Sequence, residues 1–231
     1  MKLLTIAAVA AGIAVAGSAS AATNLISNGS FENGLVGWSY TGTGDDVGPG
    51  GHPAVVIPYN SPAGYPNGAF GEPIPVDTGV VGPEAAGDNA LYFVADHSVE
   101  TISQSVFLDV GDYTIGFDAY VPFNGHSNSG DATFTGTVAG VNLANFSAHA
   151  TNAGQWFSFS GLAHITQAGF YDTAFTYNSA AAPAADFLVD RAFIVAGNAV
   201  PEPASWALMI LGFGGAGAAL RAQRRRRAVA A

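Results

Sequence analysis

Cysteine is absent from the 231 residues, and lysine and arginine are scarce. The missing thiols exclude disulfides, iron–sulfur clusters and cysteine-ligated zinc, so the fold must be stabilised by its core or by a bound metal. Of the seven basic residues, six lie near the two ends, and residues 23–200 hold only Arg191 against 16 acidic residues, a net charge of about −15. Nucleic acid and anionic lipid require Lys and Arg, which excludes them as partners of this region.

The central region also lacks the signatures of common catalytic sites. It contains no Gly-x-Ser-x-Gly elbow and no phosphate loop, and its five histidines show no metal-ligand spacing. Asp96 and His97 are adjacent, and adjacent residues of a strand point to opposite faces. With 16 acids, pairs of carboxylates occur by chance, so they do not indicate a glycosidase. We therefore predict a protein without enzymatic activity.

The N-terminus has the pattern of an export signal. Lys2 supplies a positive start, Leu3–Val15 is apolar, and Ala19–Ala21 is a small-x-small cleavage site. The apolar stretch is too short to remain in a membrane. Residues 1–22 are therefore predicted to be a signal peptide that is removed on export.

The C-terminus, residues 198–231, has three consecutive parts. A motif within 200–207 comprises Pro201, Glu202, Pro203 and Trp206. The apolar run Ala204–Leu220 has 17 residues, the lower limit for crossing a hydrocarbon core of roughly 30 Å. The cluster within 221–227 comprises Arg221, Arg224, Arg225, Arg226 and Arg227. Because arginines beside a span stay in the cytoplasm, we predict a transmembrane helix over 204–220 with the preceding domain outside.

This end resembles the PEP-CTERM sorting domain, in the form with Trp-Ala after Pro-Glu-Pro-x-x. The resemblance implies an exosortase as a partner, a membrane-embedded transpeptidase-like enzyme that cuts near Pro201–Pro203. The family occurs in Gram-negative bacteria that make exopolysaccharide or biofilm. It implies anchoring in the inner membrane before processing, and the cell surface or extracellular matrix afterwards. An ordinary tail anchor is the alternative.

Residues 23–197 fit one all-β domain, because Gly and Pro separate short β-branched and aromatic segments without a helical period. Strands are predicted at Asn24–Phe31, Gly37–Thr41, Ala90–Ala95, Thr101–Leu108, Tyr113–Tyr120, Thr133–Val138, Val141–Ser147, Trp156–Ile165, Phe170–Tyr177 and Phe187–Val195. This pattern favours a jelly-roll β-sandwich. Residues 47–88 are a Gly/Pro-rich insertion without a strand pattern, either an ordered functional loop or a mobile one.

The order of several short motifs resembles the galactose-binding-like β-sandwiches, which include many carbohydrate-binding modules. The motifs are Asn24–Glu32 followed by Gly37-Trp38, then Ile102–Phe117, Gln155-Trp156 and Phe187–Asp190. The resemblance implies a structural calcium ion held by Glu32 and Asp190, with backbone carbonyls completing the oxygen ligands. Alternatively, Asp190 pairs with its neighbours, such as Arg191, and Glu32 is solvated.

Carbohydrate modules of this kind stack sugar rings on flat aromatic side chains. The predicted platform consists of Tyr40, Tyr59, Tyr65 and Tyr120. The leading interpretation is an exported, non-catalytic surface or matrix protein associated with exopolysaccharide. A lectin-like module with a defined glycan ligand and a purely structural envelope protein are the alternatives.

Overall fold

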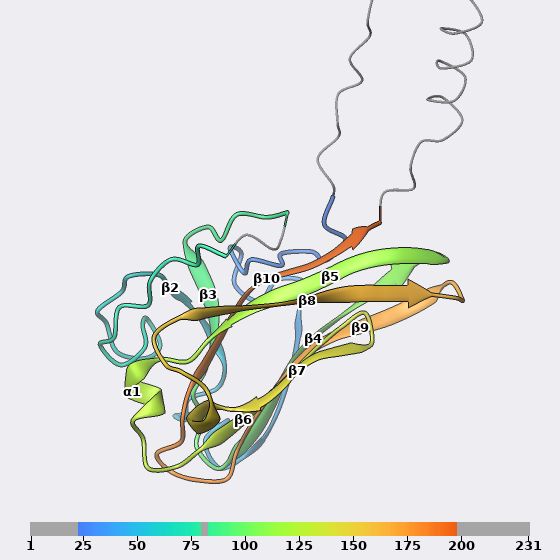
Figure 1. The fold of residues 1–231 in the computed structure, drawn as a ribbon. Coiled ribbons are helices and arrows are strands. Elements are labelled where there is room, and N and C mark those ends of the chain that lie inside the picture. Colours follow the sequence, from blue (N-terminus) through green and yellow to red (C-terminus); the bar gives the residue numbers. More distant parts are fainter. Residues whose placement is uncertain (1–22, 80–82, 198–231) are drawn as a thin grey trace, which may run out of the picture.

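In the computed structural model, residues 23–79 and 83–197 are described, and they form two antiparallel five-stranded sheets (Figure 1). The first has the order β1-β4-β9-β6-β7, made of β1 (Ser39–Gly44), β4 (Ser98–Leu108), β9 (Gly169–Ser179), β6 (Ala132–Val138) and β7 (Val141–Ser147). The second has the order β2-β3-β10-β5-β8, made of β2 (Val55–Pro58), β3 (Asn89–Phe93), β10 (Phe187–Ala196), β5 (Gly111–Tyr120) and β8 (Trp156–Ile165). Within the described ranges, the helices are two short turns, α1 (Phe123–His126) and η1 (Ala148–Ala150).

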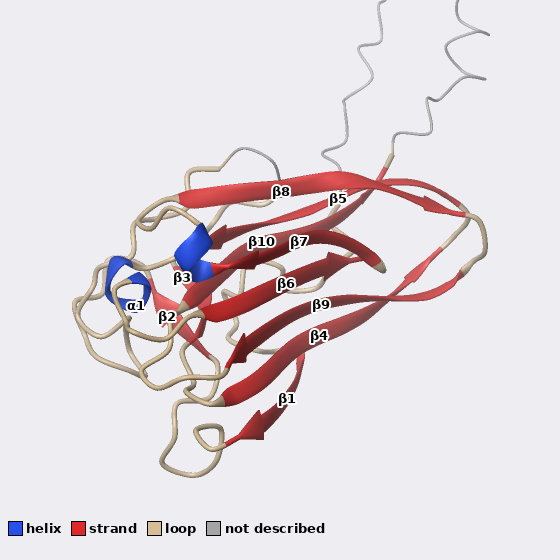
Figure 2. Ribbon diagram, turned by 60° about the horizontal axis from the view of Figure 1, so that its bottom comes forward, coloured by secondary structure: helices blue, strands red, loops and turns tan. Residues whose placement is uncertain are grey.

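The strand order is that of a jelly roll, as predicted. The eight strands from β3 to β10 are ordered β3-β10-β5-β8 in one sheet and β4-β9-β6-β7 in the other. β2 is an additional edge strand of the first of these sheets, and β1 of the second. Figure 2 shows the sheets as two layers, with β8, β5 and β10 in one and β6, β9, β4 and β1 in the other. Most strands match their predicted ranges, and β8 begins and ends at the predicted residues.

Alternation along the strands places the main core between the sheets. On β9, Thr173, Phe175 and Tyr177 are buried, whereas the intervening Thr176 and Asn178 lie on the outer face. The phenylalanine rings that meet in the core are Phe93, Phe117, Phe134, Phe175 and Phe187. Their contacts hold the two sheets together without a disulfide.

The insertion at residues 47–88 contains structure that the sequence did not indicate. It contributes β2, which pairs with β3 in the register Val56–Leu91. It also builds a second apolar cluster on the outer face of the second sheet, whose buried members are Ile57, Tyr59, Ala69, Ile74, Ala86, Ala90, Tyr92, Val94, Tyr120 and Leu188. The insertion therefore covers that face, which explains why most residues of β3 and β10 are buried on both sides.

The predicted strand at Asn24–Phe31 is wrong beyond its first residue. Asn24 forms an isolated bridge with Val195, and the chain then turns. Asn28 and Phe31 have φ of 54° and 55°, in the left-handed region that strands do not use. The Asn28 side chain donates to the Gly34 carbonyl at 2.8 Å, and such local bonds compete with a sheet ladder.

The predicted signal peptide at 1–22 and sorting signal at 198–231 lie outside the described residues. Both ends of the described chain lie at the same end of the sandwich, where Leu25 N donates to Ile194 O at 2.8 Å. Figure 1 shows α1 and the loops around β2 and β3 at the other end. Within residues 23–79 and 83–197, no helix has the length and apolar character needed to cross a membrane.

Candidate functional site

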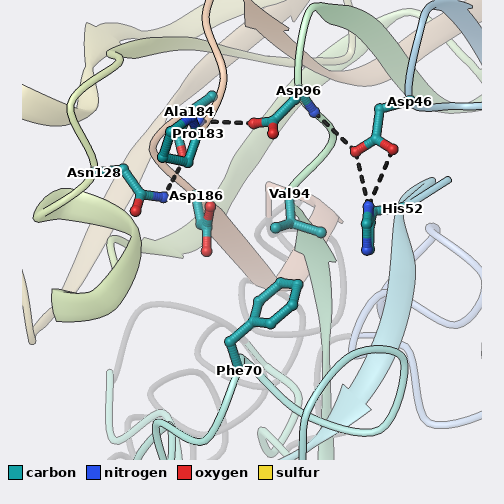
Figure 3. Close-up of a pocket in the computed structure, with 9 residues that line it drawn as sticks. All are labelled: Asp46, His52, Phe70, Val94, Asp96, Asn128, Pro183, Ala184 and Asp186. Carbon is teal, nitrogen blue, oxygen red and sulfur yellow. Dashed lines mark hydrogen bonds and ion pairs between the residues drawn. The ribbon is translucent and has the colours of Figure 1, made fainter.

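Five connecting segments meet at the α1 end of the sandwich and enclose a pocket of about 240 Å³ (Figure 3). They are the β1–β2 loop, the insertion before β3, the β3–β4 loop, the segment after α1 and the β9–β10 loop. The lining residues are Asp46, His52, Phe70, Val94, Asp96, Asn128, Pro183, Ala184 and Asp186. Three of these are aspartates and none is lysine or arginine, so the pocket carries negative charge.

An exposed aromatic ring forms one side of the pocket. Phe70 is 49% exposed, whereas the preceding Ala69 is buried. Tyr65 stacks on Phe70 with ring centroids 6.3 Å apart, and His52 meets the edge of Tyr65 at 4.9 Å. The Tyr65 hydroxyl donates to the Pro53 carbonyl at 2.8 Å. Phe70 is therefore a supported flat surface that faces solvent.

The insertion is also tied to α1 beside Phe70. The Glu72 carboxylate accepts the backbone N–H groups of Phe123 at 2.9 Å and of Asn124 at 2.7 Å. The Asn124 side chain donates to the Phe70 carbonyl at 3.4 Å. These bonds fix the loop that carries Phe70 without using its ring.

The polar side of the pocket is a chain of hydrogen bonds between loops (Figure 3). His52 Nδ1 lies 2.9 and 3.0 Å from the two Asp46 carboxylate oxygens, which places the proton on Nδ1. Asp46 Oδ2 also accepts Asp96 N–H at 3.1 Å, and Asp96 Oδ1 accepts Ala184 N–H at 2.7 Å. Asn128 Nδ2 donates to the Ala184 carbonyl at 2.5 Å. The pocket wall is thus preorganised.

Asp186 is the buried acid of this pocket. Asp186 is 3% exposed, and its Oδ2 accepts a hydrogen bond from the Tyr92 hydroxyl at 2.5 Å. Its Oδ1 is buried and has no hydrogen-bond partner. Burial raises the pKa of Asp186 to about 7, with Asp96 and Glu72 adding to the increase and the Tyr92 bond opposing it. A buried carboxylate oxygen without a donor is costly, and Asp186 is one of the residues that line the pocket.

None of the four predicted platform tyrosines lines this pocket, and Tyr65 is linked to it through ring contacts with His52 and Phe70. Tyr59 and Tyr120 are 8% and 2% exposed, so burial removes them from any surface. They belong to the apolar cluster beneath the insertion, where both rings contact Trp156. Tyr40 lies on β1, and its hydroxyl donates to Glu100 at 3.0 Å. Burial therefore rules out Tyr59 and Tyr120 as parts of an exposed platform, and the aromatic ring at the pocket is Phe70, on which Tyr65 stacks.

The predicted calcium ligands do not fit a metal site. The Glu32 carboxylate accepts the backbone N–H groups of Asp88 and Asn89, each at 2.9 Å. Asp190 is fully buried on β10, where it accepts the Tyr59 hydroxyl and the Arg191 backbone N–H. Burial raises the pKa of Asp190 to about 9, and the Tyr59 and Arg191 hydrogen bonds oppose this increase. In the described ranges no three acidic or histidine side chains gather in a metal-binding group.

A second buried group of charges holds the insertion against the sheet. Arg191 Nη1 lies 3.5 Å from Asp118 Oδ2 and 3.8 Å from Asp77 Oδ2, and Nε donates to the Glu84 carbonyl at 3.0 Å. Nη1 also donates to the Gly79 carbonyl. Asp77, Asp118 and Arg191 are all buried, so this group crosslinks the fold and is closed to solvent.

Sequence reasoning missed most residues of the pocket. Asp96 was considered only with His97, which is exposed with φ of 45° and is not part of the lining. Phe70 follows a run of Gly, Pro and Asn that gives no strand pattern. Asp46 and Asp186 are 140 positions apart, and nothing in their local sequence links them. The one sequence signal that could have indicated this pocket is an aromatic residue beside a glycine in the insertion, as in Phe70-Gly71.

Residues 199–226 match the family model described as "PEP-CTERM protein-sorting motif". The chain carries a PEP-CTERM sorting motif. The predicted motif residues Pro201, Glu202, Pro203 and Trp206 fall inside the matched range, which confirms that part of the sequence analysis. The PEP-CTERM motif marks an exported chain that an exosortase processes.

Structures similar to the described domain include several carbohydrate-binding modules, and also chains of an α-L-arabinofuranosidase and of an enzymatically active phage tailspike domain. They include TmCBM61 in complex with beta-1,4-galactotriose, at 15% identity and TM-score 0.43, covering 76% of this chain and 100% of that one. A family 16 carbohydrate-binding module has 19% identity and TM-score 0.39, with 74% and 99% covered. The CBM22-1 xylan-binding domain of Paenibacillus barcinonensis Xyn10C has 16% identity and TM-score 0.39, with 78% and 97% covered. No curated protein matches the sequence. At these values the sugar ligands are properties of those proteins alone.

Proposed function

We propose that the domain is a non-catalytic glycan-binding module, delivered outside the cell by its PEP-CTERM tail to bind exopolysaccharide. The observation that supports this most directly is the pocket, in which the exposed ring of Phe70 accompanies fixed carboxylate and amide groups. A sugar ring has an apolar face and a polar rim, and this combination of side chains complements both. The loop-end position leaves room for a long polymer to pass across the opening.

Binding without turnover is supported by the engagement of the pocket acids. Both Asp46 oxygens lie against His52 Nδ1, and Asp96 Oδ1 accepts a backbone N–H, so these carboxylates position loops. Hydrolysis of a glycosidic bond requires two acids on opposite sides of the scissile bond. In Figure 3 the aromatic ring of Phe70 lies on the other side of Val94 from Asp96. Incubation with bound oligosaccharides and chromatography of the products should recover them intact.

The stacking role of Phe70 gives a direct test. Phe70→Ala should weaken binding of the best oligosaccharide in a glycan screen by about 10-fold or more, because a buried ring face contributes roughly 1.5–3 kcal/mol. Phe170→Ala is the matched control, since Phe170 is 74% exposed at the other end of the sandwich. Affinity electrophoresis and calorimetry on the full chain in detergent measure both variants. Equal binding by Phe70→Ala and the parent chain would contradict the proposal, as would a screen without any ligand.

A further inference from the structure

The charge of the pocket restricts the kind of glycan that it can hold. Asp46, Asp96 and Asp186 line it, and no lysine or arginine does. Arg191 is the one Lys or Arg in the described ranges, and it lies beside Asp77 and Asp118 on the second sheet. Uronic acids and sulfated sugars would therefore bring negative charge to a negative wall without a compensating cation. Such like-charge contacts disfavour binding strongly.

Asp186 indicates which group the wall is built to receive. Its Oδ1 is buried and without a partner, whereas its Oδ2 is occupied by the Tyr92 hydroxyl. Oδ1 therefore needs a donor, and the nearby carboxylates of Asp96 and Glu72 favour a donor with positive charge. Asn128, another lining residue, donates its side-chain N–H to the Ala184 carbonyl, and its side-chain oxygen can accept a further hydrogen bond.

We propose that the pocket selects an amino sugar with a free ammonium group, which donates to Asp186 Oδ1 while Phe70 covers the apolar face of the ring. This rests on the glycan-binding function proposed above and specifies its ligand class. The pocket volume of about 240 Å³ suits a single sugar ring of a longer chain. N-acetylation of the same sugar removes the positive charge and adds bulk at the atom that must approach Asp186.

A bare divalent cation is the main competing occupant of an acidic pocket. Calcium takes six to eight oxygen ligands. Here Asp46 is held by His52 and by the Asp96 backbone, and the described residues contain no group of three metal-ligating side chains. The wall therefore suits one hydrogen-bonded cationic group better than a coordinated metal ion.

The test compares four tetrasaccharides by calorimetry on the full chain in detergent at pH 7. They are the glucosamine tetramer, the N-acetylglucosamine tetramer, cellotetraose and tetragalacturonate. We expect the glucosamine tetramer to bind at least 10-fold more tightly than the acetylated and neutral ones, with a loss of affinity in high salt, and tetragalacturonate not to bind. Asp186→Asn should remove the preference for the amine, so that the glucosamine tetramer binds no more tightly than cellotetraose. The matched control is Asp112→Asn, because Asp112 is an exposed acid paired with His164 at the other end.

A second readout does not depend on a variant that folds. Asp186 has a pKa of about 7, so binding of an ammonium group beside it should release a proton near pH 7. Calorimetry in two buffers of different ionisation enthalpy measures this proton release. The titratable groups that act on Asp186 are Tyr92, Asp96 and Glu72.

Equal affinity for the amine and for cellotetraose, without proton release, would overturn the amino-sugar inference and leave glycan binding standing. Absence of binding to any neutral or cationic sugar in this set and in a wider screen would overturn both. Binding of Ca²⁺ alone, abolished by Asp186→Asn, would favour the metal instead.

Discussion

Replacing Pro201, Glu202 and Pro203 together with alanine is expected to abolish release of the domain and to leave the full-length chain in the membrane fraction. The three residues lie inside the range that matches the PEP-CTERM motif. Proline disfavours helix both at its own position and at the residue before it, so the motif contains two residues that oppose helix formation. Alanine favours helix and would allow the apolar run to continue upstream.

Immunoblots of membrane and medium fractions measure this effect in a host that contains an exosortase. The parent chain should yield a shorter released form, and the triple alanine variant only the longer membrane-bound form. Val200→Ala is the matched control, because it changes the neighbouring residue and keeps the Pro-Glu-Pro sequence. Normal release by the triple variant would refute processing at this motif.

The C-terminal end of the described domain and the pocket lie at opposite ends of the sandwich. The chain leaves the described domain at Gly197, whose N–H donates to Asp112 O at 2.7 Å beside the start of β5. The pocket is built from loops at the opposite end, around α1 (Figure 1). A domain held at the membrane by its tail would therefore present the pocket away from the membrane. Glycan binding would not have to wait for processing.

The sandwich could be predicted from the sequence because its strands encode their own alternation. β8 and the β6–β7 hairpin follow directly from the local sequence pattern. β2 could not be predicted, since Val55–Pro58 is short, ends in proline and becomes a strand only by pairing with β3. β2 is therefore defined by a pairing with a strand that is distant in the sequence.

The pocket was less accessible to sequence reasoning than the fold. Asp46, Asp96 and Asp186 come together because a jelly roll brings the β1–β2, β3–β4 and β9–β10 loops to one end. No spacing rule along the chain records that convergence. Tyr59 shows the converse error, because a tyrosine in a Gly/Pro-rich loop suggests exposure, yet the loop folds back over the sheet and buries it.

Arg191→Met is expected to cost about 3–5 kcal/mol of folding free energy, which lowers the melting temperature by roughly 10 °C at pH 8. Arg191 is buried at 6% exposure and lies beside Asp118 and Asp77, so its loss leaves buried carboxylates without their cation. Arg191→Lys is the control that keeps the charge. Both replacements retain a Cβ at the same positive φ of 53°, so backbone strain does not separate them.

The pH dependence of stability distinguishes this electrostatic account from simple loss of packing. Burial raises the pKa of Asp118 to about 7 and that of Asp190 to about 9, so the folded domain favours their protonated forms. A folded-state pKa above the unfolded value gives stability that is complete at low pH and is lost as pH rises through about 7 to 9. The parent chain should therefore melt several degrees lower at pH 9 than at pH 5.5, as measured by calorimetric or fluorescence melting curves. The difference in melting temperature between Arg191→Met and the parent chain should be smaller at pH 5.5, because protonation neutralises the carboxylates whose charge the arginine otherwise compensates. A constant gap across this range, or a parent chain that is more stable at pH 9, would show that Arg191 acts by packing alone.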